Sequence, residues 1–343
     1  MTSQRVRMPA SYRILEHKDL VKASSFEHAF LIDVLNGLSR MPKRLNSRYF
    51  YDEEGSKLFQ KITELPEYYL TNCEFDILRR HKKVFSQIVA GTSFNLIELG
   101  PGEGQKTEVL LDHFLKKELE FRYIPIDISQ AAMKTLIDIL NEKYADLETE
   151  GLVAEYFDGL KWLSSTSLRR SMVLFLGSNL GNFDKPSAKD FLRNLWNALN
   201  DGDYTVIGFD LKKDIKLMLM AYNDTQGVTR KFNLNLLRRI NRELGGNFDL
   251  DKFYFYASYD VFTGAMESYL VSKEKQTVLV EEIGQTFDFD AWEPIHTEYS
   301  YKFLESDIEE LAAETGFVIE AHLYDSRKYF VDSIWRVHKH TSC

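Results

Sequence analysis

Cysteine is scarce in this chain, with only Cys73 and Cys343 among 343 residues. Two cysteines are too few for a disulfide framework or a cysteine-based zinc site, so the sequence predicts a protein of a reducing compartment without a metal centre. No stretch approaches the roughly 20 consecutive apolar residues that a membrane-spanning helix needs. The polar segment 1–18 also lacks the apolar stretch of a signal peptide. We therefore expect a cytoplasmic protein with no membrane partner.

Positive charge is also in deficit, since 43 lysines and arginines face 52 acidic residues, for a formal net charge of −9. No global positive field is available to hold a phosphate backbone, so we expect no nucleic-acid partner. Apolar residues, in contrast, make up 44% of the chain and aromatic residues 13%. A chain of this length and composition can bury a full core, either in one large domain or in two intertwined ones.

Four short apolar runs have the pattern of buried strands, and helical patterns follow the first two of them. An amphipathic stretch, residues 107–117, follows the first run, and a helix is predicted to open near Ser129 after the second. Strands that alternate with helices predict a parallel, doubly wound sheet with its ligands at the carboxyl ends of the strands. The runs are Phe94–Leu99, Tyr123–Asp127, Met172–Leu176 and Thr205–Asp210.

Residues 214–302 interrupt this alternation and read as an inserted substrate-binding subdomain. They contain a helical part, residues 232–244, and β-like runs at 269–271 and 277–280. The first seventy residues look helical and irregular, without strand alternation. After the insertion come a predicted helix, residues 306–315, and two strands, residues 318–324 and 329–338. A terminal hairpin on a parallel sheet favours the methyltransferase variant of the doubly wound fold over a dehydrogenase.

The predicted fold class is therefore α/β, a doubly wound Rossmann-like methyltransferase sheet with a second α+β substrate-binding domain. We assign residues 73–213 plus 303–343 to the methyltransferase domain.

A glycine-rich loop follows the first of these strands, in the segment Glu98-Leu99-Gly100-Pro101-Gly102-Glu103-Gly104. Its spacing disfavours a dinucleotide fingerprint, because Gln105 stands where the third glycine would be, and it disfavours a phosphate-binding P-loop, because Gln105 separates Gly104 from Lys106. What remains is an acid at the strand end, a Gly-x-Gly-x-Gly loop and a second acid, Asp127, that ends the next strand. A carboxylate there can accept hydrogen bonds from both ribose hydroxyls of S-adenosylmethionine, which is the cofactor we expect.

Several further segments make the chain resemble the histidine-specific Nα-methyltransferase family of ergothioneine biosynthesis. They occur in family order over nearly the whole chain. Together with the glycine loop and Tyr123–Ser129 they are Arg48–Ser56, Leu65–Tyr69, Phe175-Leu176-Gly177 with Gly181-Asn182, Ala221–Asp224, Phe232–Asn235, Asn241–Leu244 and Thr297–Ser300.

The resemblance implies cofactor contacts for Gly100, Lys106 and Asp127, to which the loop pattern adds Glu98 and Gly102. Adenine is expected near Phe157 and Asp158, although the family's Asp-Phe pair is not cleanly reproduced in Glu155-Tyr156-Phe157-Asp158.

The resemblance also implies that the substrate-binding domain comprises residues 1–72 plus 214–302, with an amino-acid pocket between the two domains. Asn182 and Tyr222 match the pair that binds the carboxylate, while Glu298 and Ser300 match the pair that grips the imidazole. Tyr51 and Tyr68 match tyrosines that close over the substrate, and Gly177 belongs to a matched segment of the pocket. Tyr51 and Glu298 are the expected catalytic residues, with Tyr51 orienting the amine. Each of these residues also has an ordinary structural reading as a core tyrosine, a turn residue or a cap.

The chain departs from the family in three places. Leu70-Thr71-Asn72 replaces Arg and Pro after the tyrosine pair, and Gly177-Ser178-Asn179 replaces Gly-Gly-Thr. Ser268 stands where the family has a methionine that lines the side-chain pocket. A smaller, polar wall would enlarge the pocket or admit water, so Ser268 is included among the substrate-binding candidates.

The sequence thus predicts a monomeric enzyme that transfers methyl groups, three by our expectation, from S-adenosylmethionine to the α-amino group of histidine. The first alternative is a methyltransferase of the same family that acts on another amino acid or small amine. An NAD-dependent oxidoreductase on the same sheet and a non-catalytic binding protein are further alternatives.

Overall fold

The computed structural model describes residues 9–15, 26–167 and 169–339. Most of the polar segment 1–18, as well as Cys343, lies outside these ranges.

The larger part of the molecule is built on an eight-stranded sheet. Its central strands are parallel, while β14 runs antiparallel to both β7 and β13. The carboxyl ends of the parallel strands therefore meet at one edge, where β3 leads into the glycine loop. In spatial order the strands are β1 (Ser11–Ile14), β5 (Glu150–Val153), β4 (Phe121–Asp127), β3 (Phe94–Leu99), β6 (Arg170–Phe175), β7 (Tyr204–Asp210), β14 (Phe330–Val337) and β13 (Phe317–Tyr324).

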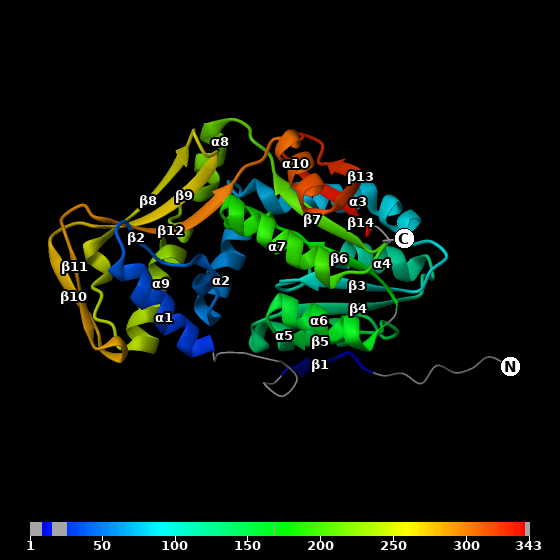
Figure 1. Cartoon of the computed structure of the whole chain (residues 1–343), viewed down its shortest axis with the longest axis horizontal. Helices are drawn as coiled ribbons and strands as arrows, with labels where there is room; N and C mark the ends of the chain where they lie inside the picture. Colours follow the sequence, from blue (N-terminus) through cyan, green and yellow to red (C-terminus); the bar gives the residue numbers. More distant parts are fainter. Residues whose placement is uncertain (1–8, 16–25, 168, 340–343) are drawn as a thin grey trace.

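Helices cover both faces of this sheet (Figure 1). Successive residues of β3 point to opposite faces, so Leu96 joins one apolar core and Ile97 joins the other. Because both faces are covered, β3 is buried along its whole length, including its two polar residues, Asn95 and Glu98, as expected for a central parallel strand. The first core includes α3 (Tyr69–Ile88), α4 (Glu108–Lys116) and α5 (Gln130–Lys143), and the second includes α6 (Tyr156–Thr166), α7 (Lys185–Ala198) and α10 (Glu305–Thr315).

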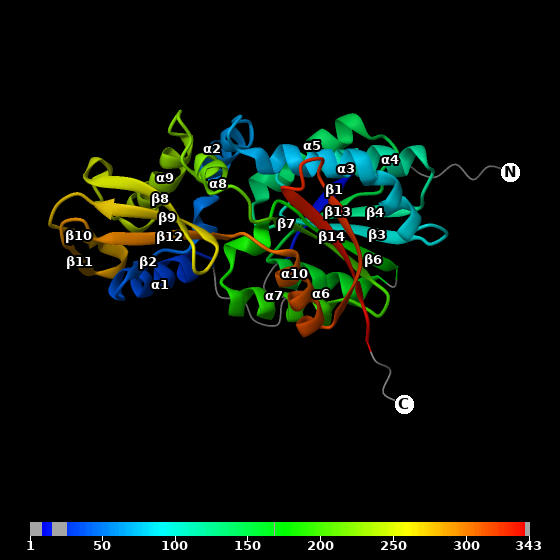
Figure 2. The same cartoon turned by 90° about the horizontal axis from the view of Figure 1, so that it is seen from above.

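The smaller part has its own four-stranded sheet, and its apolar side chains continue the first core of the larger part. In Figure 2 β12 runs from this sheet towards α10, so the two parts are joined by an extended segment. The sheet order is β2 (Lys43–Arg44), β12 (Pro294–Tyr301), β9 (Ala265–Ser272) and β8 (Phe253–Asp260). The other elements are α1 (Phe26–Ser39), α2 (Glu53–Thr63), α8 (Ile215–Tyr222), α9 (Val228–Leu244), the hairpin β10 (Gln276–Val280) with β11 (Gln285–Phe289), and short 3₁₀ turns η1 (Ser47–Phe50), η2 (Asn179–Asn182), η3 (Leu250–Lys252) and η4 (Glu281–Ile283).

The predicted strands and helices are confirmed to within a few residues, including the terminal hairpin. The helix expected near Ser129 begins there because the Ser129 hydroxyl accepts a hydrogen bond from the Ala132 backbone at 3.2 Å. The expectation of no strand in the first seventy residues is wrong. Both β1 and β2 lie in that stretch, and β1 pairs in parallel with β5 of the large sheet although residues 1–72 were assigned to the substrate-binding domain.

Candidate active site

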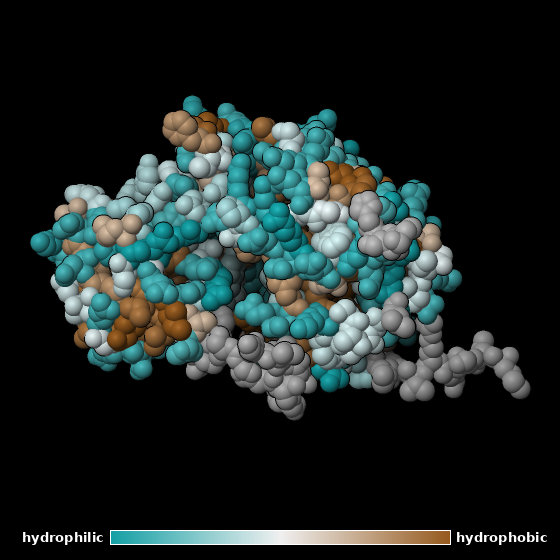
Figure 3. Space-filling model, viewed as in Figure 1, coloured by the Kyte–Doolittle hydropathy of each residue, from teal (hydrophilic) through white to brown (hydrophobic). Residues whose placement is uncertain are grey.

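A pocket lies between the two parts of the molecule, and its empty volume is about 480 Å³ including space open to solvent. The space-filling view shows the surface hollowed between these parts (Figure 3). Most of the predicted substrate residues line it, each placed by the end of an element or by a strand. They are Tyr51 after η1, Tyr68 before α3, Gly177 and Asn182 around η2, Tyr222 at the end of α8, and Glu298 and Ser300 on β12.

One wall of the pocket is polar. The Tyr222 hydroxyl and the Ser300 hydroxyl form a hydrogen bond of 2.7 Å, and Asn182 lines the same cavity. Burial raises the pKa of Tyr222 well above its ordinary value, so its side chain remains a neutral phenol. Neutral hydroxyl and amide donors of this kind can hold a carboxylate.

Glu298 supplies the acidic group of the pocket. Burial raises its pKa to about 7, although Lys302 and a hydrogen bond from the Ser268 side chain act in the opposite direction. Glu298 and Ser268 are direct cross-strand neighbours on β12 and β9. The lining of the pocket does not include Ser268, which is 1% exposed. The structure therefore places Ser268 behind Glu298, as its hydrogen-bonding support, rather than at the pocket wall where the sequence reading put it.

The stability of the free protein is expected to reveal this titration. Folding favours protonated Glu298, so the free energy of unfolding falls as the pH rises from about 4.3 to about 7, by about 3 kcal/mol. Glu298→Gln removes the ionisable group but keeps the shape. The melting temperature of this variant should exceed that of the wild type at pH 8 and match it at pH 5, as measured by scanning fluorimetry. An equal difference at both pH values would show that Glu298 does not titrate in this range.

Aromatic rings form the opposite wall. Tyr51 packs edge-on against Phe59 of α2 and Phe232 of α9, with ring centroids 5.4 and 5.6 Å apart. Phe59 also meets Tyr68 edge-on at 6.3 Å. Burial raises the pKa values of Tyr51 and Tyr68 well above the ordinary value, so both hydroxyls stay protonated. The pocket thus combines an apolar, aromatic side with a polar side that carries one acid.

The glycine loop lies at the carboxyl end of β3, and its glycines take conformations that other residues avoid. Gly100 and Gly102 have φ angles of 67° and 58°. A Cβ atom at Gly102 would meet nothing within 4 Å, whereas one at Gly100 would lie 2.7 Å from the Tyr156 hydroxyl. The loop therefore leaves its backbone accessible for close approach of a ligand, with Tyr156 lying against Gly100. This geometry fits S-adenosylmethionine.

The two acidic residues predicted to bind the cofactor, Asp127 and Glu98, have different surroundings. Asp127 ends β4 beside β3, accepts a hydrogen bond of 2.8 Å from the Ser129 backbone, and has its pKa raised by burial. Glu98, in contrast, points into the core, where the Thr107 hydroxyl (2.7 Å) and the Tyr123 hydroxyl donate to its carboxylate. These contacts support a structural role for Glu98, which fixes the start of α4 to β3.

Lys106 connects the loop to the substrate pocket. Its ammonium group pairs with the buried carboxylate of Glu74, and the other oxygen of Glu74 accepts a hydrogen bond of 2.7 Å from the Gly177 backbone. Although burial acts to lower it, the pKa of Lys106 is raised by Glu74. Phe157 and Asp158 lie in the first turn of α6, and Phe157 packs against Phe191 with ring centroids 5.1 Å apart.

Substituting Gly100 by alanine tests the loop. The new methyl group would collide with Tyr156, so the affinity for S-adenosylhomocysteine should fall by at least about tenfold, as measured by calorimetry. Gly91→Ala is the matched control, because Gly91 also has a positive φ, 75°, but open space around it. It shares the backbone strain and should bind like the wild type. Equal losses in the two variants would assign the effect to strain alone.

The sequence analysis missed several residues at or near this site, among them Phe59, Phe232, Asp210 and Lys302. Phe59 and Phe232 lie in helices whose apolar pattern reads as ordinary core. Asp210 ends β7 as Asp127 ends β4, and that parallel was a usable signal. Lys302 follows Glu298 and Ser300 at intervals of two residues, the spacing that puts strand side chains on one face.

The described residues also bear on membrane and metal-dependent functions. Among them, no helix has the length and apolar character needed to cross a membrane. Within the same ranges, no three histidine, cysteine, aspartate or glutamate side chains are grouped in a way that could hold a metal ion.

Comparison with known proteins agrees with this geometry. The family model described as "Histidine-specific methyltransferase, SAM-dependent" matches residues 30–337. A histidine N-alpha-methyltransferase of Mycolicibacterium smegmatis is 36% identical over 86% of this chain and 90% of its own length. Ergothioneine biosynthesis protein 1 of Schizosaccharomyces pombe is 34% identical over 69% of this chain and 32% of its own. A 4-dimethylallyltryptophan N-methyltransferase of Epichloe festucae var. lolii is 27% identical over 86% and 91%.

The match covers both parts of the molecule and confirms the resemblance found in the sequence. It also excludes the dehydrogenase alternative, because the family uses S-adenosylmethionine. The chain is an enzyme and belongs to the histidine-specific, S-adenosylmethionine-dependent methyltransferase family.

Proposed function

We propose that this enzyme methylates the α-amino group of L-histidine three times, giving N,N,N-trimethylhistidine (hercynine) for ergothioneine biosynthesis. The observation that carries the proposal is that one pocket contains Glu298 and Ser300 together with two neutral donors that can hold a carboxylate, Asn182 and Tyr222. A neutral imidazole has one N–H donor and one acceptor nitrogen. The Glu298 carboxylate can accept from the first, and the Ser300 hydroxyl can donate to the second.

The residues of the pocket have to hold the amine as a free base. S-Adenosylmethionine supplies a methyl group that is open to attack by a nitrogen lone pair, with the broken bond's electrons staying on sulfur. The α-amino group of a free amino acid is mostly protonated at neutral pH, so the pocket must bind its neutral form or allow its proton to leave. The Tyr51 hydroxyl can accept one N–H of the amine and so direct the lone pair. The aromatic wall excludes water and fixes the approach.

A second candidate is methylation of another amino acid or small amine. The observation that favours it is that one relative of this chain, 27% identical, is named for a tryptophan derivative, 4-dimethylallyltryptophan. The aromatic wall of Tyr51, Phe59 and Phe232 can pack against an indole as well as an imidazole.

Incubation of the purified enzyme with S-adenosylmethionine and each common amino acid, followed by mass spectrometry, separates these candidates. The expected result is a gain of three methyl groups on histidine, which also tests the number of transfers. Methylation of another amine without methylation of histidine would overturn the proposed substrate but leave the proposed N-methyl transfer in place. The ranking of substrates should be made by kcat/KM, because this ratio measures discrimination.

A further inference from the structure

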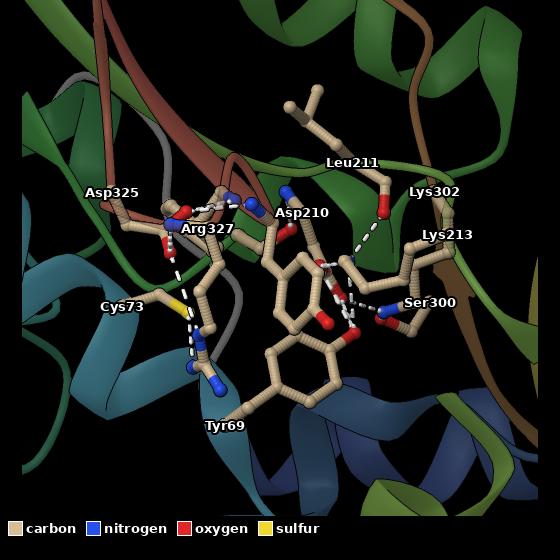
Figure 4. A network of polar contacts seen from close by, with 12 residues as sticks. Tyr69, Cys73, Asp210, Leu211, Lys213, Ser300, Lys302, Asp325 and Arg327 are labelled. Atoms are coloured by element: carbon tan, nitrogen blue, oxygen red, sulfur yellow. Dashed lines mark hydrogen bonds and ion pairs between the residues drawn. The ribbon is translucent and has the colours of Figure 1, made fainter. Parts of the chain in front are cut away.

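A buried charge cluster lies directly behind the polar wall of the pocket. The Lys302 ammonium group contacts the Asp210 carboxylate at 2.8 Å, the Tyr222 hydroxyl at 2.7 Å and the Ser300 hydroxyl at 2.9 Å. The side chains of Lys302 and Asp210 are both 0% exposed. Figure 4 shows Lys302 beside Ser300, within the network around Asp210. Lys302 therefore connects a buried acid to two hydroxyls that line the pocket.

The opposite side of Asp210 is occupied by a second cation. Lys213 pairs with the other carboxylate oxygen and donates to the Tyr69 hydroxyl at 3.1 Å, while Tyr69 donates to Asp210 at 2.8 Å. Although burial acts to raise it, the pKa of Asp210 is lowered by Lys302 and Lys213. Asp210 is thus a charged carboxylate at the edge of the site, and Lys302 is the cation that stands between it and the pocket hydroxyls.

The geometry leaves Lys302 no means of contacting the substrate itself. An ammonium group has three N–H donors, and here they have three acceptors: Asp210, Tyr222 and Ser300. Lys302 donates to both hydroxyl oxygens, and one of the two hydroxyls donates to the other at 2.7 Å, so the hydrogen of the remaining hydroxyl is available to a ligand.

Charge gives Lys302 a second effect. A substrate carboxylate held by Tyr222 would face the negative charge of Asp210 in a poorly hydrated site, where like charges repel strongly. We propose that Lys302 is a positioning residue that neutralises Asp210 towards the pocket and thereby makes the enzyme select amines that carry an α-carboxylate. This inference rests on the proposed amino-acid substrate and adds the residue that determines its carboxylate specificity.

The test compares L-histidine with L-histidinamide, which has a neutral carboxamide in place of the carboxylate. Dissociation constants are measured by calorimetry in the presence of S-adenosylhomocysteine for the full chain. The wild type should prefer histidine, and Lys302→Met should reduce this preference roughly 10- to 100-fold, mainly by lowering the affinity for histidine. Lys213→Met is the matched control, because Lys213 also pairs with Asp210 but otherwise donates to the Tyr69 hydroxyl and the Leu211 carbonyl, neither of which lines the pocket. It should keep the wild-type preference.

A double variant keeps the proposal testable if Lys302→Met alone does not fold. Asp210→Asn with Lys302→Met removes the uncompensated acid together with the lysine, and it should restore most of the preference for histidine. The proposal is overturned if Lys302→Met weakens the binding of both ligands by the same factor. It is also overturned if the double variant shows no preference between histidine and histidinamide. A wild type that binds neither histidine nor histidinamide would refute the proposed histidine substrate as well as this proposal. If the wild type binds histidine but Lys302→Met keeps the same ratio of dissociation constants for histidine and histidinamide, only the proposal for Lys302 is refuted.

Discussion

Replacement of Glu298 by alanine is expected to raise the KM for histidine roughly 10- to 100-fold and to leave kcat within about threefold. The lost interaction is a hydrogen bond from the imidazole to a buried carboxylate, and bonds to charged groups contribute about 1.5 to 3 kcal/mol. Because this contact is made both in the bound substrate and in the transition state, its loss should appear in KM. Steady-state kinetics at pH 8, where Glu298 is ionised, measure the effect directly.

Glu267→Ala provides the control for this experiment. Glu267 lies on β9 one position before Ser268, but its carboxylate bonds to the Tyr269 hydroxyl and it does not line the pocket. Its removal should change neither constant appreciably. A fall in kcat with an unchanged KM in Glu298→Ala would contradict the binding role and place Glu298 in the chemical step.

The parts of the fold that were predictable are those in which one local pattern has one structural outcome. A strand buried on both faces, such as β3, is mostly apolar along its length, and it leads directly into glycines. β1 has no such signal: Ser11–Ile14 is short, lies at the sheet edge and is mostly exposed. Its strand conformation is determined by pairing with β5, more than a hundred residues away in the chain.

The candidate site shows the same limit. Family motifs identified Glu298 and Ser300, and the structure places both in the pocket with Asn182 and Tyr222. The sequence could not show that Ser268 faces Glu298 across a strand pair, because register depends on the bulge in β12 between His296 and Glu298. Nor could it show that a lysine and an aspartate some 90 positions apart would meet behind the pocket, since that contact requires both sheets to be in place.

Substitution of Asp127 by alanine is expected to weaken the binding of S-adenosylhomocysteine by at least about 100-fold. Asp127 stands at the carboxyl edge of the sheet, one strand from the glycine loop, where its carboxylate can accept from both ribose hydroxyls. Two hydrogen bonds to a charged acceptor contribute together about 3 to 6 kcal/mol. Calorimetric titration of the purified variant measures this loss without any assumption about the methyl acceptor.

Two companion variants show which property of Asp127 matters. Asp127→Asn keeps an oxygen for the Ser129 backbone hydrogen bond, so the local turn is preserved while the charge is lost. It should also bind the ligand weakly, whereas Asp138→Ala, which removes an exposed aspartate of α5, should bind like the wild type. If Asp127→Asn bound as tightly as the wild type, the ribose contact would not depend on a carboxylate. If even Asp127→Ala did so, the cofactor would have to lie elsewhere along the carboxyl edge, and the roles given to the glycine loop would fall with it.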